Sequence, residues 1–170
     1  KIFYEDTVAN GITVLAPDVN ASDYRFVPVD RKTIRYGLGA VKGVGEPAVR
    51  AMLAAREQGG AFRDLFDFCA RVDRRMANRR VIEALIRAGA MDGLEAHQGL
   101  DRAQLMATVA LAMEAAEQAA ANAMQGGLFD MLPEAAGAAP DFVRIRPWAE
   151  RERLKEEKLA IGFFLSGHPF

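Results

Sequence analysis

The chain has 170 residues, 51% of them hydrophobic, which is enough to form a folded core and excludes wholesale disorder. No apolar run reaches the roughly 18 residues that a membrane-spanning helix needs, so no membrane association is expected. The net charge of −1 conceals a split, because residues 31–90 carry 13 Lys and Arg against 6 Asp and Glu, whereas residues 91–134 carry 1 against 7. This basic block predicts a surface that binds a polyanion; the alternative is that the arginines only solvate helix faces.

The first third of the chain predicts the end of a helix followed by short strands. Residues 1–10 have helical character, and Asn10-Gly11 is a common signal for the end of a helix. Three short segments rich in β-branched or aromatic residues predict strands: residues 12–15, 24–29 and 33–36. Because Pro28 has no N–H to donate to a neighbouring strand, we expect the second strand at the edge of its sheet.

From residue 37 onward the spacing of the apolar residues is helical. It predicts four helices, over residues 46–56, 62–72, 79–88 and 101–124. Asn78 and Asp101 are placed to cap the last two. The single cysteine, Cys69, lies on the apolar stripe of the second helix, where we expect it to be a small buried side chain. It has no partner for an internal disulfide, which fits a reducing cytoplasm.

The composition changes again near the end of the chain. Residues 133–140 are rich in Pro, Ala and Gly and predict a linker. A charged helix is expected over residues 148–159, and residues 161–165 have the β-branched and aromatic character of a strand. This strand has few partners nearby in the sequence, so we expect it to belong to a following domain of a longer protein.

The stretch that predicts most about function is Val41-Lys42-Gly43-Val44-Gly45, followed by Glu46-Pro47. Both glycines permit a positive φ and the close approach of another backbone, and Pro47 suits the first turn of a helix. A tight turn that enters a helix leaves amide donors free, and the helix dipole favours an anion there. Lys42 adds a positive charge, so the pattern predicts contact with a phosphate backbone, against the simpler alternative of a tight loop.

The next pair of predicted helices could form a second, degenerate copy of this arrangement. Its connector lacks glycines but contains Arg74 and Arg75, and the helix that follows opens with Arg79 and Arg80. Two basic turns would then lie across one groove of a duplex. The alternative is that the four arginines cover the surface of the helix pair.

A third motif, Gln125-Gly126-Gly127-Leu128-Phe129, follows the long predicted helix. Two bulky apolar side chains lie there beside glycines and just before a linker. Such a segment is typical of a docking peptide, with packing back onto the domain as the alternative.

The glycine turn resembles the helix-hairpin-helix motif of DNA polymerases, ligases and repair proteins. Nearly the whole chain is similar to one region of the C-family of bacterial replicative polymerases, the alpha subunits of DNA polymerase III. The similarity is carried by residues 14–20, 36–46, 62–69, 78–86, 125–129 and 165–169. The family includes an error-prone paralogue, and the docking peptide favours the main replicative subunit. The chain starts without an initiator Met or a signal peptide, so we expect a cut inside a longer chain.

The resemblance implies a mainly α fold with a small β element near the N-terminus, built as a tandem helix-hairpin-helix domain followed by an extended peptide and a linker. The implied division has five segments: the end of a fingers-type region with short strands over residues 1–30, the DNA-binding domain over 31–124, the clamp-binding peptide over 125–129, a linker over 130–147, and a helix and strand leading to the next domain over 148–170.

The resemblance also implies the role of each candidate residue. Lys42, Gly43, Val44 and Gly45, with Arg74, Arg75, Arg79 and Arg80, would bind double-stranded DNA. Gln125 would hydrogen-bond at the rim of a pocket on the ring-shaped sliding clamp, while Leu128 and Phe129 fill its apolar floor; Gly126 and Gly127 depart from the more usual residues there.

The implied chemistry belongs to the parent protein, a cytoplasmic DNA-directed DNA polymerase that uses magnesium in a palm domain. This chain carries no residues that resemble the palm's metal-binding aspartates, so we expect no catalytic residue, metal or cofactor in it. The expected partners are duplex DNA, the sliding clamp and other domains of the same polymerase. Two alternatives remain: an accessory domain of a DNA repair ligase or nuclease, and a purely structural connector.

Overall fold

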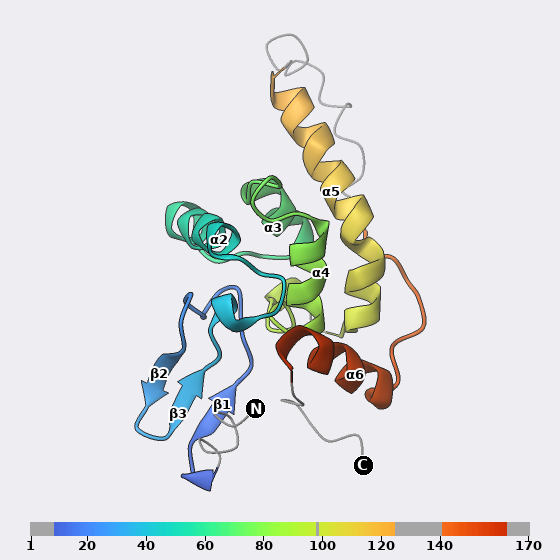
Figure 1. Ribbon diagram of the computed structural model, residues 1–170. Coiled ribbons are helices and arrows are strands. Elements are labelled where there is room, and N and C mark those ends of the chain that lie inside the picture. The colour runs from blue at the N-terminus through green and yellow to red at the C-terminus, as the bar shows by residue number, and fades with distance from the viewer. Residues whose placement is uncertain (1–8, 98, 125–140, 163–170) are drawn as a thin grey trace.

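The computed structural model describes residues 9–97, 99–124 and 141–162 (Figure 1). It is mainly helical with a small sheet near the N-terminus, which confirms the predicted fold class. The helices are α2 (Glu46–Gly59), α3 (Leu65–Arg71), α4 (Arg79–Arg87), α5 (Arg102–Met124) and α6 (Glu150–Ile161), with 3-10 turns η1 (Leu38–Ala40) and η2 (Glu95–His97). Among these described residues, no helix has the length and hydropathy to cross a lipid bilayer.

The three strands form one small sheet in the order β1-β3-β2. β1 (Thr13–Leu15) runs parallel to β3 (Thr33–Arg35), and β2 (Val27–Asp30) runs antiparallel to β3 with an irregular register between Pro28 and Asp30. Pro28 therefore lies in an edge strand, as its missing N–H predicts. The sheet lies to one side of the helices and leads through η1 to α2 (Figure 1).

The second predicted helix starts later than its apolar pattern indicates. Phe62 was expected within it, but the helix begins at Leu65. The carboxylate of Asp64 accepts a hydrogen bond from the Asp67 N–H at 2.7 Å and caps the helix. Phe62 lies before the helix and is buried in the core, with its ring centroid 4.9 Å from that of Phe68. The apolar spacing therefore correctly indicated that Phe62 belongs to the core. It wrongly indicated that Phe62 is helical, because the Asp64 cap sets the start of α3.

The two predicted caps at α4 and α5 are confirmed. The Asn78 side chain accepts a hydrogen bond from the Val81 N–H at 3.1 Å. Asp101 Oδ1 accepts one from the Ala103 N–H at 2.7 Å. Each bond satisfies a donor that has no partner inside its own helix, so both helices begin where the sequence indicates.

The charged C-terminal helix is also confirmed, but it runs further than expected. Residue 161, predicted to open a strand, is the last residue of α6, and its side chain is buried. Gly162 then ends the helix with a φ of 87°. Residues 163–165 of the predicted strand lie outside the described part of the chain, as do residues 1–8 of the predicted N-terminal helix.

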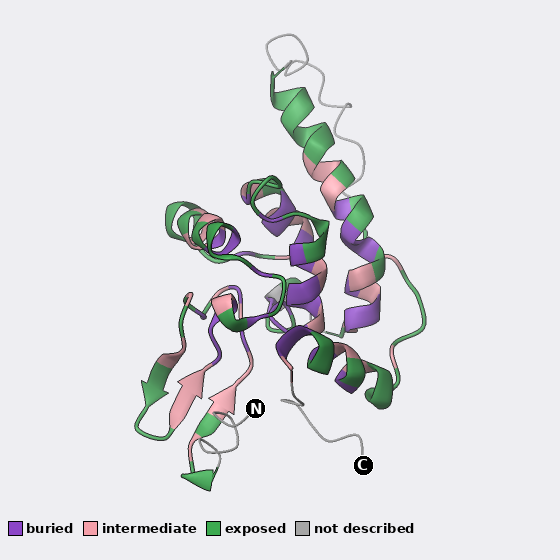
Figure 2. Ribbon diagram, viewed as in Figure 1, coloured by how far each residue is buried: buried purple, intermediate pink, exposed green. Residues whose placement is uncertain are grey.

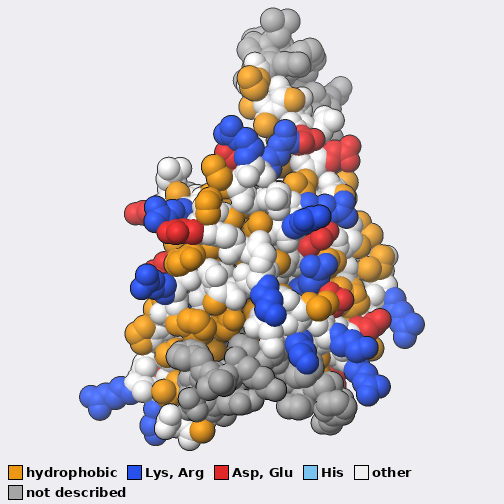
Figure 3. Space-filling view, viewed as in Figure 1, with side chains coloured by type: hydrophobic (Ala, Val, Ile, Leu, Met, Phe, Trp, Pro, Cys, Tyr) orange, Lys and Arg blue, Asp and Glu red, His pale blue; other side chains and the backbone are white. Residues whose placement is uncertain are grey.

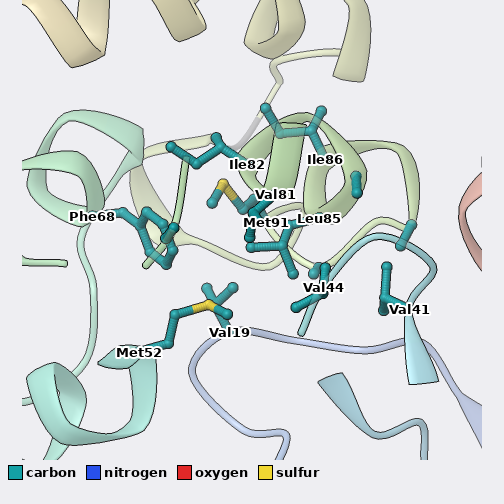
Figure 4. Packing of buried hydrophobic residues seen from close by; sticks show 14 of the residues in the cluster. Val19, Val41, Val44, Met52, Phe68, Val81, Ile82, Leu85, Ile86 and Met91 are labelled. Atoms are coloured by element: carbon teal, nitrogen blue, oxygen red, sulfur yellow. The ribbon is translucent and has the colours of Figure 1, made fainter. Parts of the chain in front are cut away.

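The hydrophobic core gathers side chains from α2, α3 and α4 and from the loops that join them (Figures 2 and 4). Val44, from the loop before α2, reaches toward Leu85 of α4 (Figure 4). Cys69 belongs to the same core, where burial, assisted by the charge of Asp64, raises the pKa of its thiol to about 12. The thiol therefore stays protonated at neutral pH, which confirms the expected buried residue.

A buried histidine joins η2 to α3. His97 is buried, its Nε2 accepts a hydrogen bond from the Leu65 N–H at 3.0 Å, and its Nδ1 lies 2.9 Å from the Met91 carbonyl oxygen. These contacts require a neutral ring with the proton on Nδ1. Burial lowers the pKa of His97 below its usual value, which favours that neutral form.

Charged side chains fix α6 against α4 and α5. Arg102, at the start of α5, is 5% exposed and pairs with Asp92 at 2.8 Å, and its Nη1 lies 3.6 Å from Oε1 of the fully buried Glu157. On the same side, Arg87 Nε lies 2.8 Å from Glu156 Oε2. Because a buried carboxylate is costly unless paired, the position of α6 is set by these contacts as well as by apolar packing.

Candidate nucleic-acid interface

The glycine turn before α2 alternates buried and exposed residues. Val41 and Val44 are buried, whereas Lys42, Gly43 and Gly45 are exposed. The Val44 N–H donates to the Val41 carbonyl oxygen at 3.1 Å and closes the turn. Gly43 has a φ of +86°, a conformation that costs other residues strain. The two valines anchor the turn to the core, so the polar backbone between and after them is presented on the surface.

Amide donors of this turn are free for a ligand. The N–H groups of Gly43 and Gly45 donate to no group among the residues that the structure describes. Gly45 is the N-cap of α2, and Pro47 occupies the first helical turn. Unpaired amides at a helix N-terminus, together with the positive end of the helix dipole, form a site for an anion such as a phosphate oxygen.

Gly45 has a different role from Gly43. Its φ is −82° and its ψ is 165°, values that any residue adopts. A Cβ built on it would meet only Pro47 Cδ, at 3.7 Å, which is ordinary contact. Neither conformation nor internal packing requires glycine at this position. The missing side chain does leave the surface open for close approach by another molecule.

The charges around the turn are positive on balance. The Lys42 side chain lies against Gly162 at the end of α6, since a Cβ built there would be 3.4 Å from Lys42 Cε and Nζ. The Lys42 N–H donates to the Ala160 carbonyl oxygen at 2.6 Å. Glu46, the acidic residue nearest the turn, is paired with Arg50 at 2.6 Å. The end of α6 therefore forms one wall of the site, which the sequence did not indicate.

The second predicted basic turn is more neutral than its sequence indicates. Three of its four arginines are paired: Arg74 with Glu117 of α5, Arg75 with Asp73 at 2.9 Å, and Arg79 with Glu83 at 2.8 Å. The hydrogen bond from Arg75 also lowers the pKa of the Asp73 carboxyl. Exposed ion pairs of this kind contribute little to stability because water screens them, so a phosphate could replace the carboxylates at little cost.

Arg80 lies on α4 one helical turn before Ala84, the residue that faces Gly43. It is exposed and forms no ion pair with any residue in the described ranges. Ala84 is one helical turn further along α4, and its Cβ would be 4.0 Å from a Cβ built on Gly43. Residues four apart on a helix are about 6 Å apart on one face, so Arg80 and the turn face one region.

Arg74 lies elsewhere. It lines a cavity of about 380 Å³ between α3, α4 and the outer half of α5, together with Phe68, Met113 and Glu117. Lys42 and the glycines are therefore in one turn, Arg80 lies one helical turn from the residue that faces Gly43, and Arg74 lines the cavity instead.

The predicted clamp-binding residues Gln125, Leu128 and Phe129 lie outside the described part of the chain. They follow directly after α5, whose last residue, Met124, is 91% exposed. Within the described ranges, no group of three or more His, Cys, Asp or Glu side chains is arranged to hold a metal ion.

The glycine turn that is anchored by Val41 and Val44 and leads into α2 is typical of one class of protein. The chain belongs to the helix-hairpin-helix motif family, whose model matches residues 11–105. Over its whole length it is 54% identical to the DNA polymerase III subunit alpha of Neisseria meningitidis serogroup B. Over 162 residues, 94% of the chain, it is 46% identical to the subunit of the same name from Vibrio cholerae and 43% identical to that of Escherichia coli K12.

These comparisons confirm the resemblance that the sequence motifs indicated. The chain spans only 14% of the length of each of these relatives. It therefore matches one region of these much longer subunits.

Proposed function

We propose that this chain is the part of a bacterial replicative DNA polymerase that holds the backbone of duplex DNA and docks on the sliding clamp. The proposal of DNA binding rests on the exposed turn at Gly43 and Gly45. The N–H groups of these two residues donate to no acceptor among the described residues. Similarity to DNA polymerase III alpha subunits supports the assignment to replication.

The turn would bind DNA through its backbone. A phosphate oxygen would accept hydrogen bonds from the N–H groups of Gly43 and Gly45, stabilised by the dipole of α2 and by the charges of Lys42 and Arg80. None of these groups reads a base edge, so binding would be independent of sequence. A polymerase that moves along its template requires contacts of this kind.

The clamp contact would be weak by itself. Burying Leu128 and Phe129 yields about 1.5–3 kcal/mol each, whereas association costs at least about 4 kcal/mol in lost freedom. These two side chains alone therefore leave little net binding free energy, so one short peptide of this kind binds weakly. Because DNA and clamp would be held by one chain, each contact raises the effective concentration of the other.

The rest of the polymerase would supply the chemistry. In this proposal the parent subunit extends DNA from deoxynucleoside triphosphates with magnesium in its palm, in the cytoplasm, and the present chain contributes affinity and processivity without catalysis. Nucleotide incorporation by the purified 170-residue chain would contradict this division.

Titration of the purified chain against fluorescent duplexes tests the DNA half of the proposal. We expect binding at low salt with equal affinity for two unrelated sequences, and a decrease in log K with log[salt] of about 0.9 per phosphate neutralised. Absence of binding at low salt, or a preference for one sequence, would contradict it.

The clamp half has a separate test. Replacing Leu128 and Phe129 together by alanine should abolish retention of the chain on immobilised sliding clamp and leave duplex affinity unchanged. Leu111→Ala is the control, because Leu111 is an exposed leucine of α5 outside the peptide. Retention of the double variant at the level of the control would refute clamp docking through this peptide.

A further inference from the structure

Three cationic side chains form a straight row along the outer face of α6. Arg151, Lys155 and Lys158 are all exposed and are spaced four and three residues apart. At 3.6 residues per turn, this spacing keeps all three within one narrow sector of the helix, and position 162 continues the same sector. Lys and Arg side chains gather over α6 in the space-filling view (Figure 3).

The row leads directly to the glycine turn. Gly162 lies one helical turn beyond Lys158 and touches the side chain of Lys42, while the Ala160 carbonyl oxygen accepts the Lys42 N–H at 2.6 Å. The cations of α6 and of the turn therefore form one continuous surface. Lys42 is also favoured at this position because it lies at the negative end of the α6 dipole.

The buried face of α6 fixes the direction of the row. Leu154 and Glu157 are fully buried, and Glu157 lies 3.6 Å from Arg102 of α5. Rotation of this face away from the core would expose Leu154 and remove a carboxylate from the buried Arg102, so the row keeps its orientation relative to the turn.

At about 100° per residue, the four glutamates of α6 lie outside the sector that holds the row. Three of its four glutamates are used elsewhere: Glu152 accepts the Ala149 N–H at 3.2 Å, Glu156 pairs with Arg87, and Glu157 faces Arg102. Like charges four residues apart, such as Arg151 and Lys155, destabilise a helix slightly. Although α6 carries equal numbers of acidic and basic residues, this sector of the helix holds cations of one sign.

We infer that α6 is a second DNA-binding element, which holds successive phosphates of the duplex whose backbone enters the glycine turn. This inference rests on the proposed DNA binding of the turn. From residue 151 to residue 162 the helix rises about 16 Å, and each DNA strand carries one charge about every 3.4 Å of helix axis. The row is therefore long enough to face more than one phosphate of a strand.

The test compares two triple variants of the 170-residue chain. One replaces Arg151, Lys155 and Lys158 by glutamine. The control replaces three other exposed cations, Arg31, Lys32 and Arg63, by glutamine and has the same net charge. Duplex affinity is measured by fluorescence anisotropy over a range of salt concentrations, and thermal melts verify that both variants fold.

If α6 holds phosphates, the first variant should bind more weakly than the control. Its log–log salt slope should also be shallower by roughly 0.9 for each phosphate that it no longer neutralises, up to about 2.7 for three. Equal slopes for the two variants would overturn the inference while leaving the glycine turn as a DNA site. Failure of the unmodified chain to bind duplex would instead overturn the proposed function itself.

Binding of polyglutamate under the same conditions separates DNA from an acidic protein as the partner. Loss of polyglutamate binding in the α6 variant, with an unchanged duplex slope, would assign the row to a protein surface and overturn the inference.

Discussion

Aspartate in place of Gly45 would put a carboxylate at the N-cap of α2, where we propose that a phosphate binds. Gly45 has φ −82° and ψ 165°, and its Cβ position is open apart from ordinary contact with Pro47. The substitution therefore requires no rearrangement of the turn. Its side chain can accept hydrogen bonds from the first amides of α2, as aspartate does at many helix starts.

Folding and DNA binding should respond in opposite directions. Aspartate at an N-cap is preferred over glycine by a few tenths of a kcal/mol, and a negative charge there interacts favourably with the helix dipole by about 0.3–1 kcal/mol. Replacing glycine also reduces the number of conformations open to the unfolded chain, which raises the free energy of unfolding further, by about 0.4–1 kcal/mol. We expect Gly45→Asp to unfold at an equal or higher urea concentration than the unmodified chain.

Duplex affinity should fall for two reasons. The carboxylate takes the amide donors that a phosphate would use, and it repels a phosphate held nearby. Two unit charges about 5 Å apart repel by roughly 1–3 kcal/mol for effective dielectric constants between 80 and 20. This corresponds to a loss of roughly five- to 150-fold, with a salt slope shallower by about 0.9 if one phosphate is no longer held.

The assay is duplex titration at several salt concentrations, beside urea unfolding of the same samples. Gly45→Asn caps the helix without a charge and should lose less affinity. Gln58→Glu changes the net charge equally at the other end of α2 and should have little effect. If Gly45→Asp binds duplex as tightly as Gln58→Glu, the turn does not hold a phosphate.

Three further predictions concern stability. Gly43→Ala should lower the free energy of unfolding by about 1–2 kcal/mol in urea titrations, because φ is +86° there. Leu85→Ala should cost about 2–5 kcal/mol because Leu85 is fully buried, and a loss as small as that of exposed Leu111→Ala would contradict the described core. Burial lowers the pKa of His97 in the folded chain, so the unfolded chain takes up the proton first. Stability present above about pH 6.5 should fall as the pH drops through the lower folded pKa, and His97→Gln should flatten that dependence in melts from roughly pH 8 to pH 5.

Elements were predictable where two local signals agree. Asn78 and Asp101 each precede an apolar helical pattern, and both helices begin after them. Pro28 correctly indicated an edge strand. The predicted start of α3 was wrong. Phe62 has the apolar spacing of a helix residue, but the Asp64 side chain accepts a backbone N–H after it and caps the helix at that point.

The candidate site was predictable only in its local part. The glycine turn is contiguous in sequence, so its residue types and order were sufficient to indicate it. The ion-pair partners of the arginines could not be predicted from the sequence. Glu117, for example, belongs to α5, which is far from Arg74 in the sequence and lies beside it only in the folded chain. The contact between Lys42 and Ala160 likewise joins residues that are far apart in the sequence, and no periodicity encodes it.

The outer part of α5 determines where the chain leaves the domain. Met113 and Ala116 of this helix still pack against the core, and the helix continues to Met124, so about 12 Å of it extends further (Figure 2). A helix is stiffer than a glycine-rich linker, so this segment acts as a semi-rigid spacer that fixes the distance between its two ends. Shortening this helix by four residues would move its C-terminal end inward by about 6 Å and rotate that end by about 40° around the helix axis. The number of helical residues therefore sets both the position and the direction in which the chain leaves α5.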